Sequence, residues 1–453
     1  MIVSFSVTNF RSFSSEETFS LVASNRLAGR HEDHAVPIPD SNERVLRTAV
    51  LYGANGAGKS NLFKALQYLK SIALDTRPKN SGTGREAFRF GGTASEPSVF
   101  DLQFVARNSL YRFGVKVDDE KIREEWLVRV VGGREKTIYE RVTTDGGDVT
   151  IQASGLEGLK VRALTTVGGP QNQSFIATIQ ATLEPADFGD YLREVVDWFR
   201  DGLSLIAPDV SLTSLGHSLS RNPNLLEFAG NFLRASGTGV DRVGIRKQMI
   251  SKDKFEGLLP GLALGGLKQG LAQDGTMIYY SNEDDLVVAA SPGEDQVELI
   301  TIHTAHEHQP GKIIPMDLAA ESDGTRRLLD LMPALHTLHT RGGVYFVDEI
   351  DRSLHPMLVR NFLDHFLHSC DGSQRQLIMT THESNLLDQE LLRRDEIWFA
   401  EKDPAGASHI YSLMDFKVRN DLEIRKHYLQ GRFGAVPFLG DPARLPTETN
   451  PTV

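Results

Sequence analysis

The stretch Gly53-Ala54-Asn55-Gly56-Ala57-Gly58-Lys59-Ser60 decides the fold of this chain, because it fits the pattern GxxxxGK[ST] without a mismatch. The five mostly apolar residues before it, 48–52, have the composition of a short buried strand. In residues 61–72, apolar side chains recur at helical spacing. A strand, a glycine-rich loop and a helix form the context in which this pattern binds phosphate. Glycines let successive N–H groups point at one anion, and the helix N-terminus adds partial positive charge.

This loop predicts a site for ATP and Mg²⁺. Lys59 should reach the β- and γ-phosphates, and the hydroxyl group of Ser60 should bind Mg²⁺. The predicted nucleotide-binding residues of the loop are Asn55, Gly56, Ala57, Gly58, Lys59, Ser60 and Asn61.

A second motif, residues 344–349, is an apolar strand that ends in Asp348 and Glu349. This is a Walker B pattern, in which Asp348 is expected to bind the same Mg²⁺ and Glu349 to polarise the attacking water. The long segment between the P-loop and this strand indicates a large insertion between two halves of one ATPase.

Two further features accompany the Walker B strand. Residues 321–328, Glu-Ser-Asp-Gly-Thr-Arg-Arg-Leu, begin a predicted helix with Ser322 as its N-cap. His382 directly follows the predicted strand 376–381, a place that resembles that of the switch histidine of ABC ATPases, and the resemblance implies a contact with the γ-phosphate or the attacking water. Glu349 and His382 are therefore the predicted catalytic residues.

Composition limits the class of protein. The chain has 453 residues, of which 40% are hydrophobic and 24% charged. Its formal net charge of −11 argues against a protein that binds polyanions over its whole surface. No apolar run is long enough to span a membrane, and the N-terminus lacks the features of a signal peptide. The single cysteine, Cys370, excludes an internal disulfide. We expect a cytoplasmic protein without membrane association.

The predicted organisation has four parts. Residues 1–170 form a first ATPase lobe that holds an N-terminal hairpin, the P-loop and an antiparallel β-meander over 98–142. Residues 171–275 form a mostly helical insertion, which includes a helix over 190–205 and a basic, solvated helix face over 241–254. Residues 276–439 form the second lobe, and residues 440–453 a disordered tail. The histidines at 31 and 34 lie in a predicted polar loop, and those at 303–308 lack the pattern of a metal site.

The order NFRSF, GANGAGKS, ESDGTRRL, VYFVDEIDRSLHP and TTHES resembles the ABC/SMC-like AAA ATPases of bacterial anti-phage defence. These are the RloA, AbiL-type and PARIS AriA group, relatives of RecF and the OLD ATPases. Further similar segments are residues 172–175, 198–199, 394–398, 401–402 and 431–437. The chain departs from the group where the usual Leu-Ser-Gly-Gly signature is Glu-Ser-Asp-Gly, and where residues 233–240 lack the usual acid.

The resemblance implies an α/β fold, an ABC-type P-loop ATPase head of two lobes with a β-meander and a mostly helical insertion. It also implies a homo-oligomer in which Ser322 and Gly324 of one copy complete the ATP site of another. Arg11 should lie near the nucleotide, and Gln103 is the candidate Q-loop glutamine. The relatives usually act with a separately encoded effector, often TOPRIM-like, so a TOPRIM-like nuclease is a candidate effector here. A phage protein or DNA is a candidate trigger.

The sequence is compatible with three functions. The first is a Mg-dependent ATPase that acts as a sensor or scaffold switch in abortive infection. The second is a RecF-like DNA-repair ATPase, favoured by the basic stretch 241–254 and opposed by the net charge. The third is a regulatory module without hydrolysis, against which the intact Glu349 argues.

Overall fold

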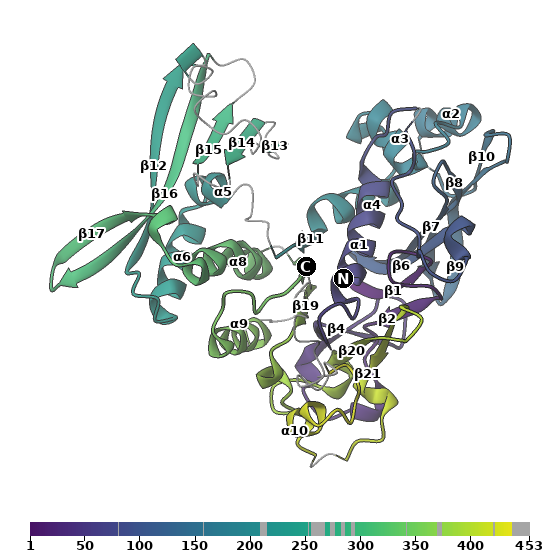
Figure 1. Ribbon diagram of the computed structural model, residues 1–453. Coiled ribbons are helices and arrows are strands. Elements are labelled where there is room, and N and C mark those ends of the chain that lie inside the picture. The colour runs from purple at the N-terminus through teal and green to yellow at the C-terminus, as the bar shows by residue number, and fades with distance from the viewer. Residues whose placement is uncertain are drawn as a thin grey trace, which may run out of the picture. The chain divides into compact units, whose positions relative to one another are not determined.

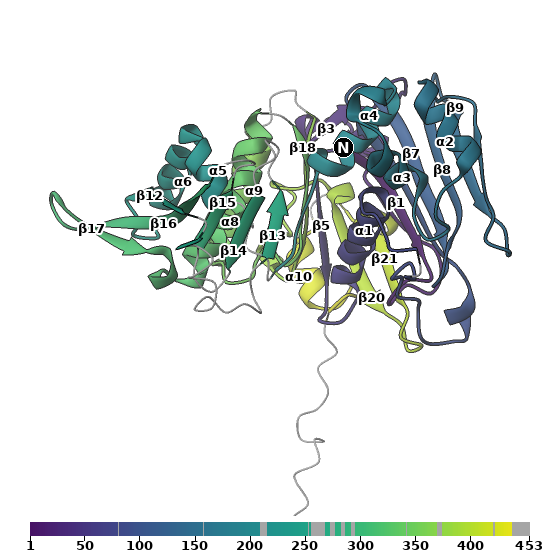
Figure 2. The same cartoon turned by 90° about the horizontal axis from the view of Figure 1, so that it is seen from above.

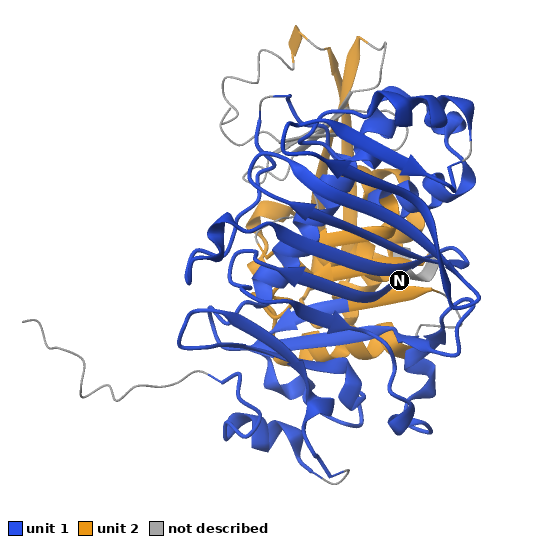
Figure 3. Cartoon of the chain, turned by 90° about the vertical axis from the view of Figure 1, so that its right-hand side faces the viewer, with its two compact units in different colours: residues 1–200, 378–453 blue, residues 201–377 orange. Residues whose placement is uncertain are grey.

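The computed structural model (Figure 1) describes residues 1–79, 81–156, 158–208, 215–251, 253–254, 268–271, 277–281, 286–290, 295–340, 342–368, 374–419 and 422–436. The chain forms two compact units (Figure 3). Unit 1 consists of residues 1–200 and 378–453, and unit 2 of residues 201–377. Cys370 and the predicted tail from Gly440 lie outside the described residues. Strands and helices are mixed in the chain, so the predicted α/β fold class is confirmed.

A seven-stranded antiparallel sheet forms one layer of unit 1, in the order β10-β9-β8-β7-β6-β1-β2. Its strands are β1 (Ile2–Thr8), β2 (Glu17–Ser20), β6 (Ser98–Ala106), β7 (Ser109–Val117), β8 (Ile122–Val131), β9 (Arg134–Thr143) and β10 (Val149–Ala153). Alternate apolar residues such as Phe100, Leu102 and Phe113 are fully buried, because every second side chain of a strand points to the same face. The predicted N-terminal hairpin and β-meander are confirmed. Gln103 lies within β6, opposite Arg112.

A second layer of unit 1 carries the P-loop. Strand β5 (Thr48–Gly53) is buried along its whole length and runs parallel to β20 (Ile397–Lys402), which pairs with the antiparallel β21 (Ser408–Ser412). Helix α1 (Lys59–Leu74) follows and lies between β5 and the antiparallel sheet (Figure 2). Its apolar residues Leu62, Phe63, Leu66 and Leu69 are buried, which confirms the predicted helix.

Short elements complete unit 1. They are β3 (Ala35–Pro37), β4 (Arg44–Leu46), α2 (Leu159–Val167), α3 (Phe175–Thr182), α4 (Asp190–Asp197), β19 (Arg375–Thr381), whose last residues belong to this unit, and α10 (Ile424–Leu429).

The segment of residues 172–175, which resembles the defence ATPases, has a structural role. The side-chain amide of Asn172 donates to the carbonyl oxygens of Pro78 and Ser81, both at 2.7 Å. Ser174 caps α3 and donates its hydroxyl hydrogen to the carbonyl oxygen of Ile72 at 2.6 Å. These bonds tie α3 to the end of α1 and to the loop behind it. The segment therefore stabilises the P-loop helix from its C-terminal end.

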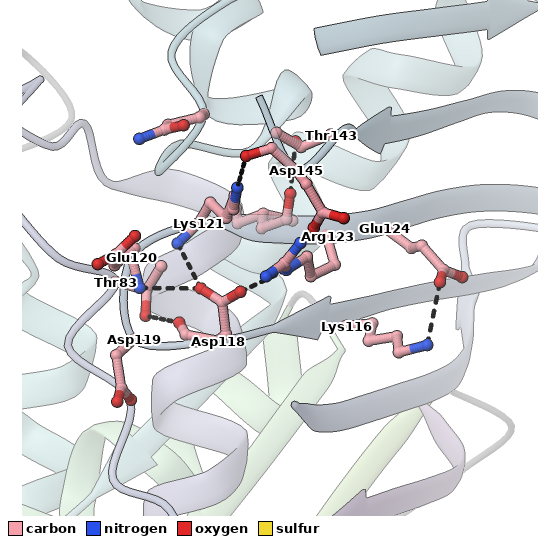
Figure 4. A network of polar contacts seen from close by, with 12 residues as sticks. Thr83, Lys116, Asp118, Asp119, Glu120, Lys121, Arg123, Glu124, Thr143 and Asp145 are labelled. Atoms are coloured by element: carbon pink, nitrogen blue, oxygen red, sulfur yellow. Dashed lines mark hydrogen bonds and ion pairs between the residues drawn. The ribbon is translucent and has the colours of Figure 1, made fainter. Parts of the chain in front are cut away.

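The turn between β7 and β8 is built around Asp118 (Figure 4). One carboxylate oxygen of Asp118 accepts hydrogen bonds from the backbone N–H groups of Glu120 at 2.9 Å and Lys121 at 2.8 Å, and the other pairs with Arg123. The hydroxyl group of Thr83 donates to the Asp118 carbonyl oxygen, which anchors the segment between α1 and β6. Partial burial of Asp118 opposes its ionisation, but these hydrogen bonds outweigh burial and lower its pKa.

Asp118→Asn is expected to lower the free energy of unfolding by about 1 kcal/mol at pH 7, because the pairing with Arg123 is lost. A lowered folded-state pKa means that the contribution of Asp118 is present above the unfolded pKa of about 3.9 and is lost as the pH falls through the folded pKa. The difference between wild type and variant should therefore disappear in acid. Urea unfolding at several pH values measures it, with the exposed Glu120→Gln as control. A difference that persists below pH ~2 would contradict this account.

Unit 2 contains a five-stranded sheet path in the order β12-β16-β15-β14-β13, with β17 also paired to β16. Its elements are β11 (Leu203–Ile206), α5 (Leu215–Arg221), α6 (Pro223–Ala235), β12 (Arg242–Ser251), β13 (Lys268–Leu271), β14 (Met277–Ser281), β15 (Leu286–Ala290), β16 (Gln296–Gln309), β17 (Lys312–Asp317), α8 (Asp323–Thr340), β18 (Gly343–Val347) and α9 (Pro356–His368). Strand β11 runs parallel to β18.

Two helices predicted between 171 and 275 are corrected by the structure. The basic stretch 241–254 contains strand β12, which pairs with β16 from Arg242 opposite Ala305 to Ser251 opposite Gln296. The predicted helix 190–205 is present as α4 (Asp190–Asp197) and a directly following π-helix (Trp198–Gly202), and only its last residues, from Leu203, belong to β11 instead. In both segments, pairing with a strand that is distant in the sequence determined where the strand forms. The spacing of apolar residues within a segment does not reveal such a partner.

The predicted solvated loop over residues 23–44 is also corrected at one position. His34 is buried, and its Nδ1 atom lies 3.0 Å from Oε1 of Glu396, which is buried as well. Burial opposes the charged imidazole, but the hydrogen bond and the charge of Glu396 outweigh it and raise the pKa of His34. The contact with Glu396 favours the burial of His34. Because Glu396 is distant in the sequence, the residues around His34 do not reveal this contact.

Candidate functional site

The P-loop of unit 1 depends on two glycines with positive φ. Gly56 has φ +77° and an open surrounding, whereas Gly58 has φ +114° and lies against Ser408. A Cβ atom at Gly58 would collide with the Ser408 side chain and stand 3.2 Å from Oγ of Ser12. Only glycine combines this backbone conformation with this approach. Glycine at position 58 therefore lets the loop pack directly against Ser408.

Lys59 and His382 lie together in unit 1. The Lys59 side chain is buried, and its Nζ atom donates to the carbonyl oxygens of Gly53 at 2.8 Å and Ala54 at 3.2 Å. Nε2 of His382 lies 3.1 Å from the same Nζ. Strand β19 is fully buried and ends at Thr381, so it delivers the exposed His382 to the loop. Two predicted site residues that are distant in sequence are thus in direct contact.

The NFRSF segment borders the loop through a residue that the sequence did not single out. Oγ of Ser12 accepts a hydrogen bond from Nδ2 of Asn61 at 2.7 Å, and the Ser12 carbonyl oxygen accepts from the backbone of Ser408 at 2.7 Å. The neighbouring Arg11 pairs its guanidinium group with Glu86. Arg11 therefore lies next to a residue of the P-loop border, with its charge balanced by Glu86. The only sequence signal for Ser12 was its place directly after Arg11.

The remaining residues of the loop differ in exposure. Asn55 and Gly56 are exposed, Ala57 is buried, and Ser60 and Asn61 are half-buried. The exposed tip and the buried base fit a loop that offers N–H groups to an anion on one side and packs on the other.

The start of α8 in unit 2 carries the signature-like residues. Ser322 is exposed, and its Oγ accepts from the backbone of Thr325 at 3.2 Å, which confirms the predicted N-cap. Gly324 approaches the loop after β18 closely, since a Cβ atom there would stand 2.8 Å from the carbonyl oxygen of Ser353. The helix start is therefore packed on the loop that follows the Walker B strand.

The Walker B acids follow β18. Asp348 is 2% exposed, and its backbone N–H donates to the carbonyl oxygen of Ile206 at 2.9 Å. Glu349 has φ +49°, an uncommon conformation for a residue other than glycine. Its carbonyl oxygen accepts from the backbone of Arg352 at 3.0 Å. A tight turn directly after a buried strand thus presents the two carboxylates.

The predicted site residues fall into two sets. The set in unit 1 comprises Arg11, Asn55, Gly56, Ala57, Gly58, Lys59, Ser60, Asn61 and His382. The set in unit 2 comprises Ser322, Gly324, Asp348 and Glu349.

The described residues hold no cluster of three or more histidine, cysteine or acidic side chains able to bind a metal ion. His306, one of the three neighbouring histidines, instead contacts Glu321 at 2.6 Å. In the described part of the chain, every helix is too short or too polar to cross a membrane.

Comparison with known proteins identifies the family. Residues 49–147 and 200–388 match the family described as "AAA domain, putative AbiEii toxin, Type IV TA system". Among solved structures, the SMC head domain from Thermotoga maritima is 12% identical at a TM-score of 0.36, covering 91% of this chain and 98% of that chain. An SmcHead bound to the C-winged helix domain of ScpA is 13% identical at a TM-score of 0.39, covering 91% and 97%. No curated protein gave a significant match. Because the family match spans more than half of the sequence and includes Lys59, Asp348, Glu349 and His382, the chain belongs to this AAA-domain family.

Proposed function

We propose that this protein is a Mg-dependent ATPase that hydrolyses ATP to ADP and phosphate. The observation that carries the proposal is the contact between Lys59 and His382 at 3.1 Å beside the glycine-rich loop 53–60. Lys59 would hold the β- and γ-phosphates, and His382 would contact the γ-phosphate or the water beside it. The loop N–H groups and the start of α1 would bind the remaining phosphate charge.

Three further residues have proposed roles in this reaction. Ser60 and Asp348 would hold Mg²⁺, which when bound neutralises phosphate charge. Glu349 would accept a proton from the attacking water, as a general base does.

The site is proposed to be completed by a second copy of the chain. Ser322 is exposed at the start of α8, and Gly324 supplies a backbone N–H there. A hydroxyl group, free N–H groups and a helix N-terminus together suit the γ-phosphate of a nucleotide bound by another subunit. ATP would then join heads into a dimer or a larger homo-oligomer.

The biological role that we propose is a cytoplasmic switch in anti-phage defence of the abortive-infection type. The family description, with its toxin–antitoxin context, and the motif resemblance to the RloA, AbiL-type and AriA group support this role. ATP-dependent assembly would hold or release a separately encoded effector, for which a TOPRIM-like nuclease is a candidate. A phage protein or DNA would be the trigger.

Ser322→Arg tests the completion in trans. A long cation in place of the small hydroxyl group should block the approach of a second head and lower turnover at least about tenfold, with ATP affinity nearly unchanged. Steady-state hydrolysis and nucleotide titration measure the two quantities. Ser154→Arg, at an exposed serine after β10, is the matched control. Full hydrolysis and normal ATP-dependent assembly in Ser322→Arg would refute the proposed role of Ser322.

The alternative of a DNA-dependent ATPase is favoured by one observation. Strand β12 exposes Arg242, Arg246 and Lys247, although Lys247 is paired with Glu298 at 3.2 Å. Duplex DNA that binds in a salt-sensitive manner and accelerates turnover would favour this function, and loss of the effect in Arg242→Gln/Arg246→Gln would locate it.

A further inference from the structure

Arg327, in the second turn of α8, connects that helix to the Walker B strand. Only 6% of Arg327 is exposed. Its Nη1 atom donates to the carbonyl oxygen of Ala207 at 3.3 Å, and its Nη2 atom donates to that of Asp348 at 3.4 Å. Ala207 directly follows β11, and Asp348 directly follows β18. One guanidinium group thus bridges the carboxyl ends of two parallel strands.

Several charged side chains lie near Arg327. Burial and the positive charge of Arg352 lower the pKa of Arg327, while the carboxylates of Asp330, Asp348 and Glu349 act in the opposite direction without offsetting burial. Its Nε atom is buried without a hydrogen-bond partner among the described residues. Since a buried donor without an acceptor is destabilising, an apolar side chain of similar volume would serve packing better. Stability alone therefore does not account for an arginine at this position.

The carbonyl group that Arg327 holds belongs to the peptide bond between Asp348 and Glu349. A change of ψ at Asp348 or of φ at Glu349 would turn this carbonyl group and reorient the Glu349 side chain relative to that of Asp348. The backbone after it is already in an uncommon conformation, with φ +49° at Glu349 and φ +61° at Ser353. Gly324, three residues before Arg327, lets the carbonyl oxygen of Ser353 approach closely. The first two turns of α8 therefore hold both ends of the turn 348–353.

We propose that Arg327 is a positioning residue for the Walker B acids, which holds the Asp348 carbonyl and so sets the orientation of the Asp348 and Glu349 side chains. The inference rests on the proposed ATPase function only where it concerns turnover. The geometric part concerns the backbone of 348–353 and can be tested without ATP.

The test uses the full chain with Arg327→Met, which keeps the volume and removes the charge and all donors, and Arg327→Lys, which keeps the charge but cannot bridge both carbonyls. Arg221→Met, at an exposed arginine at the end of α5, is the control for charge. Hydrogen–deuterium exchange of the peptide 344–354 should be faster in Arg327→Met, with the rest of the chain unchanged. ATP turnover should fall by roughly 10- to 100-fold, with ATP affinity within about threefold of wild type. Arg327→Lys should lie between wild type and Arg327→Met in both measurements.

Three results would overturn the inference: unchanged exchange over 344–354, faster exchange throughout unit 2, or equal losses of affinity and turnover. If Arg327→Met does not fold, the same measurements on Arg327→Lys decide the matter. A wild-type protein that binds ATP without hydrolysing it would refute the proposed function, whereas the exchange of 344–354 would still decide the role of Arg327.

Discussion

Glu349→Gln is expected to reduce ATP turnover by at least about 100-fold and to leave ATP binding intact, because the amide cannot accept a proton from the attacking water. The substitution keeps the shape of the side chain and adds no strain beyond that of Glu349 itself, at φ +49°. The ATP-bound state should therefore accumulate. If ATP joins heads, light scattering of the variant should show a rise in mass with Mg-ATP.

Each outcome of this measurement separates the proposals. A large complex without ATP would indicate a constitutive scaffold from which ATP controls release. A monomer in both conditions, with ATP demonstrably bound, would count against completion of the site by Ser322 and would favour the DNA-dependent alternative. Wild-type protein that turns over ATP no faster than Glu349→Gln would favour the regulatory module without hydrolysis. Glu227→Gln, at an exposed glutamate of α6, is the control for loss of one negative charge.

Gly58→Ala is expected to weaken ATP binding by roughly 100-fold. At φ +114°, an alanine has an unfavourable backbone conformation worth about 1–3 kcal/mol, and its Cβ atom would also collide with Ser408. The loop must shift to relieve both problems, and its N–H groups then no longer converge on one phosphate. Isothermal titration with ATP measures the loss.

Gly56→Ala distinguishes the effect of backbone strain from that of the collision with Ser408 within the same loop. Gly56 also has positive φ, at +77°, but no atom lies within 4 Å of the place where its Cβ would stand. Only conformational strain is introduced, so its affinity should fall by no more than about tenfold. Equal losses in the two variants would show that the close approach to Ser408 contributes nothing. Normal affinity in Gly58→Ala would contradict the role of this loop in binding phosphate.

Sequence patterns predicted the elements that depend on local chemistry. The loop 53–60 contains its own glycines and lysine, and the apolar spacing of 61–72 gave the helix that follows. The alternation in β6 and β7 gave the meander, and Ser322 gave the start of α8. The patterns failed where a partner was distant. The basic stretch became β12 because β16 pairs with it, and His34 became buried because Glu396 accepts its hydrogen bond.

The sequence by itself determined the chemistry that the chain can offer: a lysine and a serine in a phosphate loop, two acids after a buried strand, and a capped helix before them. These features are encoded within short segments, since capping, glycine conformations and apolar spacing act between near neighbours. Only the tertiary structure decided which side chains meet. Ser12 bonds to Asn61, His382 contacts Lys59, and Arg327 holds the carbonyl of Asp348. Such contacts join segments whose approach depends on the packing of whole strands and helices, and no local pattern records it.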